Sequence, residues 1–207
     1  MNKTNHKIAE QSKKSLTDAL LKVMEQYDFK EITVTQISQE AKLSRKTFYR
    51  LFKNKEEILD QFLINIMNEF SQKIKDEEIS DYWNIIRMYF DFWKEKKELL
   101  LLFKKNNLLF LLYEISYKHS FNIFNMVHSE KNFLKFSNSL PYILAYSIGG
   151  LHSMLIKWVE DDMIYPYDTF LLNLKKSFEP EEEILFIQKL HYHLNYNMLQ
   201  QLLIFLL

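Results

Sequence analysis

Residues 33–59 read TVTQISQEAKLSRKTFYRLFKNKEEIL and contain two short helical patterns separated by a tight turn. The first pattern has the i, i+3, i+7 spacing of one buried helical face, in Val34, Ile37 and Ala41. Thr33 or Thr35 is suited to cap this helix, because a threonine oxygen can accept a free amide of the first turn. The pattern predicts a short amphipathic helix that ends just before Leu43.

The second pattern begins after the turn, where Ser44 is suited to cap another helix. At about 100° per residue, its inward side collects the apolar residues Phe48, Leu51 and Phe52. The remaining side chains face outward or, in the case of Arg45 in the first turn, can still reach outward along the surface. They are Arg45, Lys46, Thr47, Tyr49 and Arg50. Two short helices joined in this way predict a helix-turn-helix.

The outward side chains suit duplex DNA. Arginine and lysine can bond guanine edges or phosphates, and threonine and tyrosine hydroxyls can bond phosphate oxygens. Asn54 is suited to cap a third helix beginning at Lys55, whose free backbone amides could hold a phosphate with the help of the lysine. The alternative interpretation is an ordinary helical hairpin with a solvated charged face.

This segment resembles the helix-turn-helix of the TetR family of bacterial one-component regulators. The resemblance rests on Tyr49, Phe52, Lys55, Glu56 and Glu57, and upstream on Phe29, Ile32, Thr33, Val34, Ile37, Ala41, Leu43, Ser44 and Thr47. It covers roughly the first third of the chain and implies a DNA-binding head. With the outward face above, the predicted DNA contacts are Thr33, Thr35, Ser44, Arg45, Lys46, Thr47, Tyr49, Arg50 and Lys55.

Two positions depart from the family pattern. Lys42 stands where the family usually has glycine, because the turn needs a left-handed backbone that other residues disfavour by about 1 kcal/mol. A Lys42→Gly variant is therefore expected to be more stable. Lys46 stands where a small residue is common, so the operator preference of the family does not carry over.

Charge is unevenly distributed along the 207 residues, although the whole chain is neutral. Residues 1–60 hold 12 Lys+Arg against 9 Asp+Glu, a net +3, and the remainder holds 15 against 18, a net −3. The positive excess therefore coincides with the helix-turn-helix. It is small, which favours binding through dimerisation and local contacts over a broad basic field.

The chain has no cysteine, which excludes disulfides and thiolate metal sites. It begins without an apolar signal segment, so we expect a cytoplasmic protein. Residues 136–156 contain no Asp, Glu, Lys or Arg and are long enough to span a bilayer. Several polar residues interrupt them, which favours a buried interface helix over a membrane span.

Helical periodicity without strand signals predicts an all-α fold. We expect a DNA-binding head with its connecting helix in residues 1–70 and a helical regulatory and dimerisation body in residues 71–207. The first helix is predicted over about Ile8 to Tyr27 and the connecting helix over residues 55–70. Helix breaks are expected near residues 104–107, 128–140, 160–168 and 177–182.

Aromatic residues concentrate in the body, with 27 of the 32 Phe, Tyr and Trp residues after residue 60. Such side chains line sites for apolar or aromatic small molecules, although a plain aromatic core is the alternative. The TetR resemblance implies an inducer pocket in this region. Its candidate residues are Tyr89, Phe90, Trp93, Phe103, Phe110, Tyr113, Tyr117, His119 and Phe121.

Residues 141–163 resemble the penultimate helix of one TetR subgroup, in which a Gly-Gly pair lets helices approach within a dimer. Gly149 and Gly150 weaken a helix unless close packing compensates, so we predict a dimer interface that includes them with Met154 and Trp158. A kink or break within one subunit is the alternative. The apolar residues 183–207 either join this interface or fold against the body.

No catalytic motif, metal-ligand cluster or cofactor fingerprint is present, so we expect no enzyme activity, no metal and no cofactor. The predicted function is a homodimeric DNA-binding transcriptional regulator, a repressor released from palindromic double-stranded operator DNA by a small-molecule effector. The alternative is a co-regulator or activator whose body responds to a partner protein. The sequence does not identify the effector or the operator.

Overall fold

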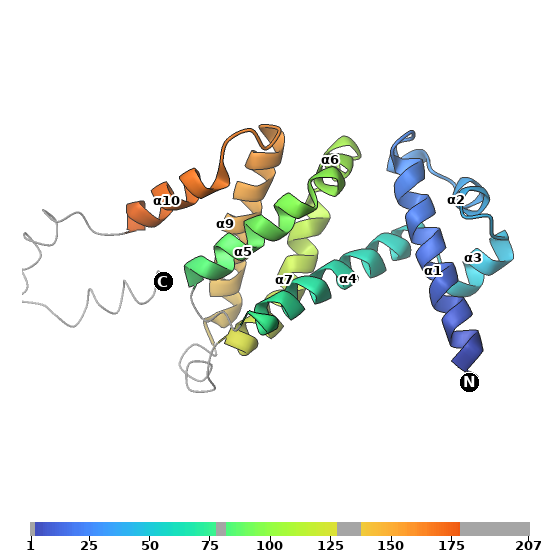
Figure 1. The fold of residues 1–207 in the computed structure, drawn as a ribbon, viewed down its shortest axis with the longest axis horizontal. Helices are drawn as coiled ribbons and strands as arrows, with labels where there is room; N and C mark the ends of the chain where they lie inside the picture. The colour runs from blue at the N-terminus through green and yellow to red at the C-terminus, as the bar shows by residue number, and fades with distance from the viewer. Residues whose placement is uncertain (1–2, 78–81, 128–137, 179–207) are drawn as a thin grey trace, which may run out of the picture. The chain divides into compact units, whose positions relative to one another are not determined.

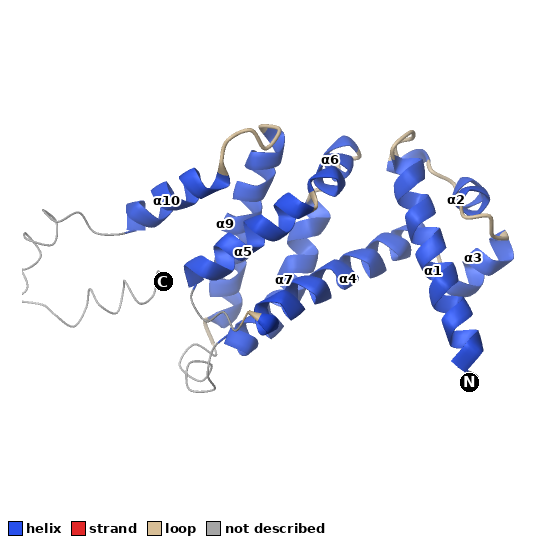
Figure 2. Ribbon diagram, viewed as in Figure 1, coloured by secondary structure: helices blue, strands red, loops and turns tan. Residues whose placement is uncertain are grey.

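The computed structural model describes residues 3–77, 82–127 and 138–178, and every regular element in these ranges is a helix (Figures 1 and 2). In chain order they are α1 (Lys3–Met24), the 3-10 helix η1 (Phe29–Glu31), α2 (Val34–Glu40), α3 (Arg45–Leu51), α4 (Lys55–Asp76), α5 (Tyr82–Glu95), α6 (Lys97–Lys105), α7 (Phe110–Val127), α9 (Leu140–Glu160) and α10 (Tyr167–Phe178). The predicted all-α fold is confirmed.

The head, defined as α1, η1, α2 and α3, is built on α1, which packs against α2, α3 and the following α4. Leu16, Leu20 and Met24 form the fully buried stripe of α1. The helix ends at Met24, three residues before the predicted end at Tyr27, which is 46% exposed. The chain turns away there because the Asp28 side chain accepts the Lys30 amide and starts η1.

Helix α4 connects the head with the helices that follow, because it packs against α1 and also against α5 and α7. Its buried residues repeat at helical spacing over its whole length: Ile58, Leu59, Leu63, Ile66, Met67, Phe70, Ser71 and Ile74. The connecting helix predicted for residues 55–70 is present and runs on to Asp76. The domain boundary predicted after residue 70 therefore falls inside a helix, and it stays a prediction.

The body, defined as α5, α6, α7 and α9, has an aromatic and aliphatic interior. Helices α7 and α9 lie side by side, and α6 packs against both α5 and α9. The largest side chains in this interior are at most 1% exposed: Phe90, Phe92, Trp93, Phe103, Leu112 and Leu155. Such complete burial makes them the main hydrophobic stabilisation of the body.

Two predicted helix breaks are confirmed, those between α6 and α7 and between α9 and α10. The structure adds a break that the sequence did not predict, at Lys96 between α5 and α6. The predicted break at residues 128–140 lies mostly outside the described residues, as does that at 177–182. The apolar segment 183–207 lies outside them entirely.

Contacts along the chain group Met1–Tyr165 into one compact unit and Pro166–Leu207 into a second, which contains α10. The head, α4 and the body therefore belong to the same unit. Among the described helices, none has the length and apolar character needed to cross a membrane.

Candidate DNA interface

Helix α2 begins at a reciprocal cap. The Thr33 hydroxyl oxygen accepts the Gln36 amide at 3.3 Å, and the Gln36 side-chain oxygen accepts the Thr33 amide at 2.8 Å. This capping box satisfies two amides that would otherwise be unpaired at the helix start. Of the two predicted caps, Thr33 therefore takes the role, and Thr35 is an exposed residue of the first turn.

The turn between α2 and α3 is closed by two backbone hydrogen bonds around Lys42. The Leu43 amide donates to the Ser38 carbonyl at 2.9 Å, and the Lys42 amide donates to the Gln39 carbonyl at 3.0 Å. This pair of bonds is the Schellman arrangement, which requires a left-handed residue between them. Lys42 is that residue, with φ of 54°, so the predicted left-handed backbone is confirmed.

Helix α3 begins at Ser44, whose hydroxyl oxygen accepts the Thr47 amide at 3.0 Å as predicted. On its inner side Phe48 is fully buried, Phe52 is 4% exposed and Leu51 is half-buried. These positions agree with the inward face expected from the sequence. The caps and the buried rings thus fix both ends and one side of this two-turn helix.

The outer side of α3 carries the exposed residues Arg45, Lys46, Tyr49 and Arg50. Tyr49 is 54% exposed, and its ring meets that of Phe48 edge to face with centroids 5.4 Å apart. The three cations and the phenol are therefore accessible together on one short helix. We call Arg45, Lys46, Tyr49 and Arg50 the α3 outer face.

Three of the predicted hydroxyl contacts, those of Thr33, Ser44 and Thr47, already form hydrogen bonds within the fold. Thr33 and Ser44 cap their helices, and the Thr47 hydroxyl lies 3.0 Å from that of Ser44. A hydroxyl oxygen has two lone pairs and one proton, so each retains some capacity for a further bond. Nearby, the Glu40 carboxylate is paired with Lys22.

Lys55 is placed differently from the prediction. Its ammonium group donates to three backbone carbonyls of the η1 segment, those of Phe29 at 2.6 Å, Lys30 at 3.0 Å and Ile32 at 2.8 Å. An ammonium group has only three N–H donors, so none is left over for a phosphate. The structure therefore corrects the predicted role of the Lys55 side chain, because the half-buried lysine ties α4 to the η1 segment.

The rest of that prediction concerned the Asn54 cap and the free backbone amides at the start of α4. The Asn54 side chain accepts the Glu57 amide at 2.9 Å, and the Glu57 carboxylate accepts the Lys53 amide at 2.5 Å. The predicted Asn54 cap is confirmed. The backbone amides of Lys55 and Glu56 lie in the first turn, where no partner within the helix exists for them.

The segment from α1 to the first turns of α4 also matches a known family. Residues 16–62 match the model of bacterial regulatory proteins of the tetR family. This head belongs to the TetR family. The match begins on the buried stripe of α1 and ends beyond the α4 cap, so it includes all nine predicted contact residues.

Part of the chain is similar to two curated relatives. The chain is 31% identical over 99 residues to the HTH-type dhaKLM operon transcriptional activator DhaS of Lactococcus lactis subsp. lactis strain IL1403, a match covering 48% of this chain and 46% of the relative. It is 33% identical over 61 residues to the uncharacterized HTH-type transcriptional regulator YhgD of Bacillus subtilis strain 168, covering 30% and 32%. The chain thus spans less than half the length of either relative.

Four of the nine pocket candidates lie in the packed interior of the body. Tyr89, Phe90, Trp93 and Phe103 are at most 5% exposed. The Tyr89 ring meets those of Phe90 and Trp93 edge to face, with centroids 5.6 and 6.3 Å apart. Burial raises the pKa of the Tyr89 phenol, which therefore stays neutral and bears no charge in this interior.

The other five candidates belong to α7 and are more accessible. Phe110, Tyr117 and Phe121 are 54%, 37% and 45% exposed, and Tyr113 and His119 are half-buried. Tyr113 stacks on Tyr117 with centroids 6.0 Å apart and an angle of 15° between the rings. The structure therefore divides the nine candidates between the body interior and α7, and their role in a ligand pocket remains a prediction.

The dimer candidates also divide. Gly149 and Gly150 lie inside the unbroken helix α9, so the alternative of a break at this pair was wrong. A Cβ added to either would meet no atom within 4 Å apart from the local helix backbone. Trp158 is instead accounted for within the subunit, because its indole donates to the Tyr165 carbonyl at 2.8 Å and its ring meets that of Phe90. Met154 is half-buried.

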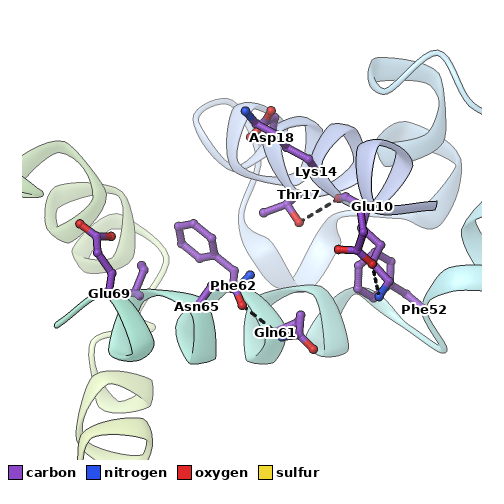
Figure 3. Close-up of a pocket in the computed structure, with 11 residues that line it drawn as sticks. Glu10, Lys14, Thr17, Asp18, Phe52, Gln61, Phe62, Asn65 and Glu69 are labelled. Carbon is purple, nitrogen blue, oxygen red and sulfur yellow. Dashed lines mark hydrogen bonds and ion pairs between the residues drawn. The ribbon is translucent and has the colours of Figure 1, made fainter. Parts of the chain in front are cut away.

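The described residues contain a polar cleft of about 570 Å³ between α1 and α4 (Figure 3). Glu10, Lys14 and Asp18 line it from α1, and Phe62 and Glu69 line it from α4. None of the nine pocket candidates reaches it. In the described part of the chain no group of three or more His, Asp or Glu side chains is arranged to hold a metal ion.

Proposed function

We propose that the chain is a homodimeric, DNA-binding transcriptional regulator whose α3 helix enters the major groove. The observation that carries this proposal is the α3 outer face, which groups three exposed cations and a phenol on a helix capped at Ser44 and packed by Phe48. Arginine and lysine on such a helix can read guanine edges or bind phosphates. The TetR-type match of residues 16–62 supports the same assignment.

The contacts around this face divide by type. Arg45 and Lys46 lie in the first turn of α3, the part of a recognition helix that reaches base edges. Thr35, Tyr49 and Arg50 supply exposed hydroxyl and cationic groups for phosphates. Thr33, Ser44 and Thr47 would add bonds only through the spare capacity of their capping hydroxyls. At α4 we propose the backbone amides of Lys55 and Glu56 as the phosphate ligands, in place of the Lys55 ammonium group.

A homodimer is supported by the outer surface of α9. Tyr142 and Tyr146 are 78% and 68% exposed and lie one turn apart, and Gly149 and Gly150 follow one turn further on the same side. Two exposed aromatic rings beside a helix surface without side chains suit close packing of a second copy. Two α3 helices about 34 to 36 Å apart would then enter successive major grooves of a palindromic site.

Fluorescence anisotropy with labelled duplexes from the region upstream of the protein's own gene tests the DNA proposal. We expect specific binding by the native chain and a loss of about 1–3 kcal/mol for Arg45→Ala if that residue bonds a base. Tyr49→Ala should weaken binding as well. Lys97→Ala, at an exposed position on α6, is the matched control and should bind as the native chain does. Equal, sequence-independent binding by all four proteins would overturn the proposal.

For the response of the body, we propose first a repressor that a small molecule releases from DNA. Support comes from the aromatic lining candidates of α5, α6 and α7, which suit an apolar or aromatic effector with few polar groups. Binding would shift α4, which packs against both the head and the body, and thereby change the spacing of the two α3 helices.

A second candidate is an activator or co-regulator that responds to a partner protein. Two observations favour it: the L. lactis relative is named a transcriptional activator, and four of the pocket candidates are tightly packed core residues. A promoter fused to a reporter separates the two roles, because loss of a repressor raises expression and loss of an activator lowers it. A melting-temperature screen with apolar small molecules then tests for an effector, since a ligand that binds the folded state raises the melting temperature.

A further inference from the structure

The last turn of α6 forms hydrogen bonds in two directions. Asn106, which follows the last residue of α6, is 3% exposed, and its side chain reaches residues about 80 positions away. Its oxygen accepts the Phe29 amide at 2.8 Å, and its amide nitrogen donates to the Met24 carbonyl at 3.3 Å and the Leu102 carbonyl at 2.9 Å. One buried side chain therefore joins α6 of the body to both ends of the α1–η1 connection.

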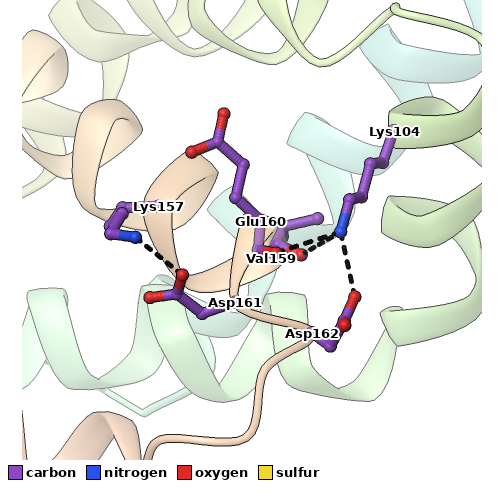
Figure 4. Close-up of polar contacts among 6 residues, drawn as sticks. All are labelled: Lys104, Lys157, Val159, Glu160, Asp161 and Asp162. Atoms are coloured by element: carbon purple, nitrogen blue, oxygen red, sulfur yellow. Dashed lines mark hydrogen bonds and ion pairs between the residues drawn. The ribbon is translucent and has the colours of Figure 1, made fainter.

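The two lysines before Asn106 bind different parts of the protein, Lys105 the end of α1 and Lys104 the end of α9. Lys105 donates to the carbonyl of Glu25 in the head. Lys104 donates to the Val159 and Glu160 carbonyls, both at 3.1 Å, and pairs with Asp162 at 2.9 Å (Figure 4). Lys104 thus holds the C-terminal end of α9, while Lys105 and Asn106 hold the C-terminal end of α1.

The head side of this link continues to the helix-turn-helix. Asn106 fixes the amide of Phe29, and the carbonyl of the same residue accepts the Lys55 ammonium group. Lys55 also binds the Ile32 carbonyl, immediately before the Thr33 cap of α2. A series of polar contacts therefore leads from α9 through the last turn of α6 to the starts of α2 and α4.

We propose that the segment Lys104–Asn106, which we call the α6 joint, positions the head relative to the body and transmits movement of α9 and α6 to it. Asn106 is its central positioning residue. The proposal rests on the proposed function insofar as it concerns DNA affinity. The α6 joint would transmit movement directly from α6 to α1 and η1, in addition to any transmission along α4.

The chemistry of the joint favours a fixed arrangement. Asn106 uses its oxygen and both of its N–H donors within a nearly dry site, where an unsatisfied polar group is costly. Its bonds are therefore expected to form or break together. At the ends of α1 and α9, Lys105 and Lys104 place positive charge where the helix dipoles favour it. Displacement of either helix end would strain the same three-residue segment.

Hydrogen exchange of the full-length protein tests the joint without DNA. Asn106→Ala should raise exchange of the Phe29 amide by about tenfold, because its acceptor is removed. The substitution that tests transmission is Lys104→Gln, since the hydrogen bonds and ion pair given above for Lys104 all involve Val159, Glu160 and Asp162. We expect it to raise exchange over residues 24–33 as well as at the end of α9. Lys97→Gln, at the exposed start of α6, is the control and should leave both regions unchanged.

If Lys104→Gln changes exchange only at α9 and α6, the joint transmits nothing to the head and the proposal fails. Should Asn106→Ala not fold, Lys105→Gln supplies the head-side arm, because this exposed lysine contributes one bond to Glu25 and its loss leaves no buried group unpaired. Increased exchange over the whole chain in Lys104→Gln, in place of the two named regions, would indicate general destabilisation and would also overturn the proposal.

DNA affinity adds a second readout. Lys104→Gln is expected to change affinity for the upstream duplex by roughly three- to tenfold with an unchanged salt dependence, because no phosphate contact is lost. An Arg50→Gln variant should instead reduce the salt dependence. If the native chain binds no specific DNA, the proposed function fails while the exchange measurements still decide the joint. Unchanged affinity in Lys104→Gln, with native binding intact, would overturn the coupling.

Discussion

The ammonium group of Lys55 lies 2.6 Å from the carbonyl oxygen of Phe29 and 4.8 Å from the centroid of that residue's ring. The same lysine therefore donates to backbone carbonyls of the η1 segment and covers the Phe29 ring, whose residue is 7% exposed. Charge-assisted bonds of this kind are among the stronger polar contacts in proteins. They bring the start of α4 against the segment that leads into α2, and so help to set the relative positions of the helices proposed to bind DNA.

Replacement of Lys55 by methionine is expected to destabilise the protein. Three carbonyls lose their shared donor while the apolar stem is kept, so the loss should be on the order of 1.5–3 kcal/mol, as for hydrogen bonds to charged groups. Thermal or urea unfolding of the purified variant measures it. Lys53→Met, at an exposed position two residues earlier, is the control and should change stability little. Equal stability of the two variants would contradict the role given to Lys55.

Lys42 gives a prediction of opposite sign. Its φ of 54° lies in the left-handed region, which disfavours residues with a Cβ by roughly 1–2 kcal/mol and leaves glycine unstrained. Glycine also gains freedom in the unfolded chain, which offsets up to about 1 kcal/mol. Lys42→Gly should therefore raise the melting temperature slightly. Lys42→Ala, which removes the same side chain but keeps the strain, should not, and a lower melting temperature for the glycine variant would refute the assignment.

The sequence predicted most accurately what depends on neighbours within one or two helical turns. The Ser44 and Asn54 caps bond amides three residues away, and the burial of Phe48 follows from helical spacing alone. Lys55 and Asn106 were different, because their partners at Phe29 lie 26 and 77 residues away. No local pattern specifies such contacts. At residues 104–107 the sequence indicated only a helix break. It gave no indication that these residues form hydrogen bonds with the ends of α1 and α9.

Contacts between residues distant in sequence also explain why the sequence predicted the body less accurately. Aromatic composition predicted a packed or ligand-binding region but not which rings would face inward, since that depends on how four helices pack together. Trp158 was predicted to join the dimer interface together with Met154 and the Gly149–Gly150 pair. Its indole N–H instead finds the Tyr165 carbonyl beyond the end of α9, where the chain turns back after Asp162 and Met163. Satisfaction of that buried donor, which sequence spacing does not reveal, keeps the ring within the subunit.

His152 predicts a dependence of stability on pH. Burial lowers the pKa of its imidazole from 6.5 to about 4, and its Nδ1 has no hydrogen-bond partner among the residues that the structure describes. Between these two pH values the imidazole of the unfolded chain binds a proton that the imidazole of the folded chain does not. The contribution of His152 to the free energy of unfolding is therefore complete above pH 6.5 and is lost as the pH falls toward 4. His152 alone is expected to contribute about 1 kcal/mol per pH unit to the slope of the unfolding free energy between pH 6 and 5.

Urea unfolding at a series of pH values measures this slope, and its comparison between variants isolates the histidine. His152→Gln should flatten the slope between pH 6.5 and 5, whatever its effect on stability at pH 7.5. His6→Gln, which alters an exposed histidine near the start of α1, is the control and should keep the native slope. The same slope in His152→Gln as in the native protein would show that His152 is not protonated on unfolding in this range.

Alanine substitutions at Gly149 and Gly150 test the proposed dimer, because they should have different effects depending on whether the α9 surface is exposed to solvent or packed against a second copy. Within the subunit a Cβ at either position would meet open space, and alanine is about 1 kcal/mol better than glycine inside a helix. If the α9 surface stays in solvent, Gly149→Ala and Gly150→Ala should each stabilise the protein and leave its mass in solution unchanged. If α9 packs closely against a second copy, the added methyl groups push the helices apart. We expect the second result, a weaker dimer in sedimentation-equilibrium measurements, and Ser153→Ala, on the same surface but without added volume, should leave dimerisation nearly unchanged.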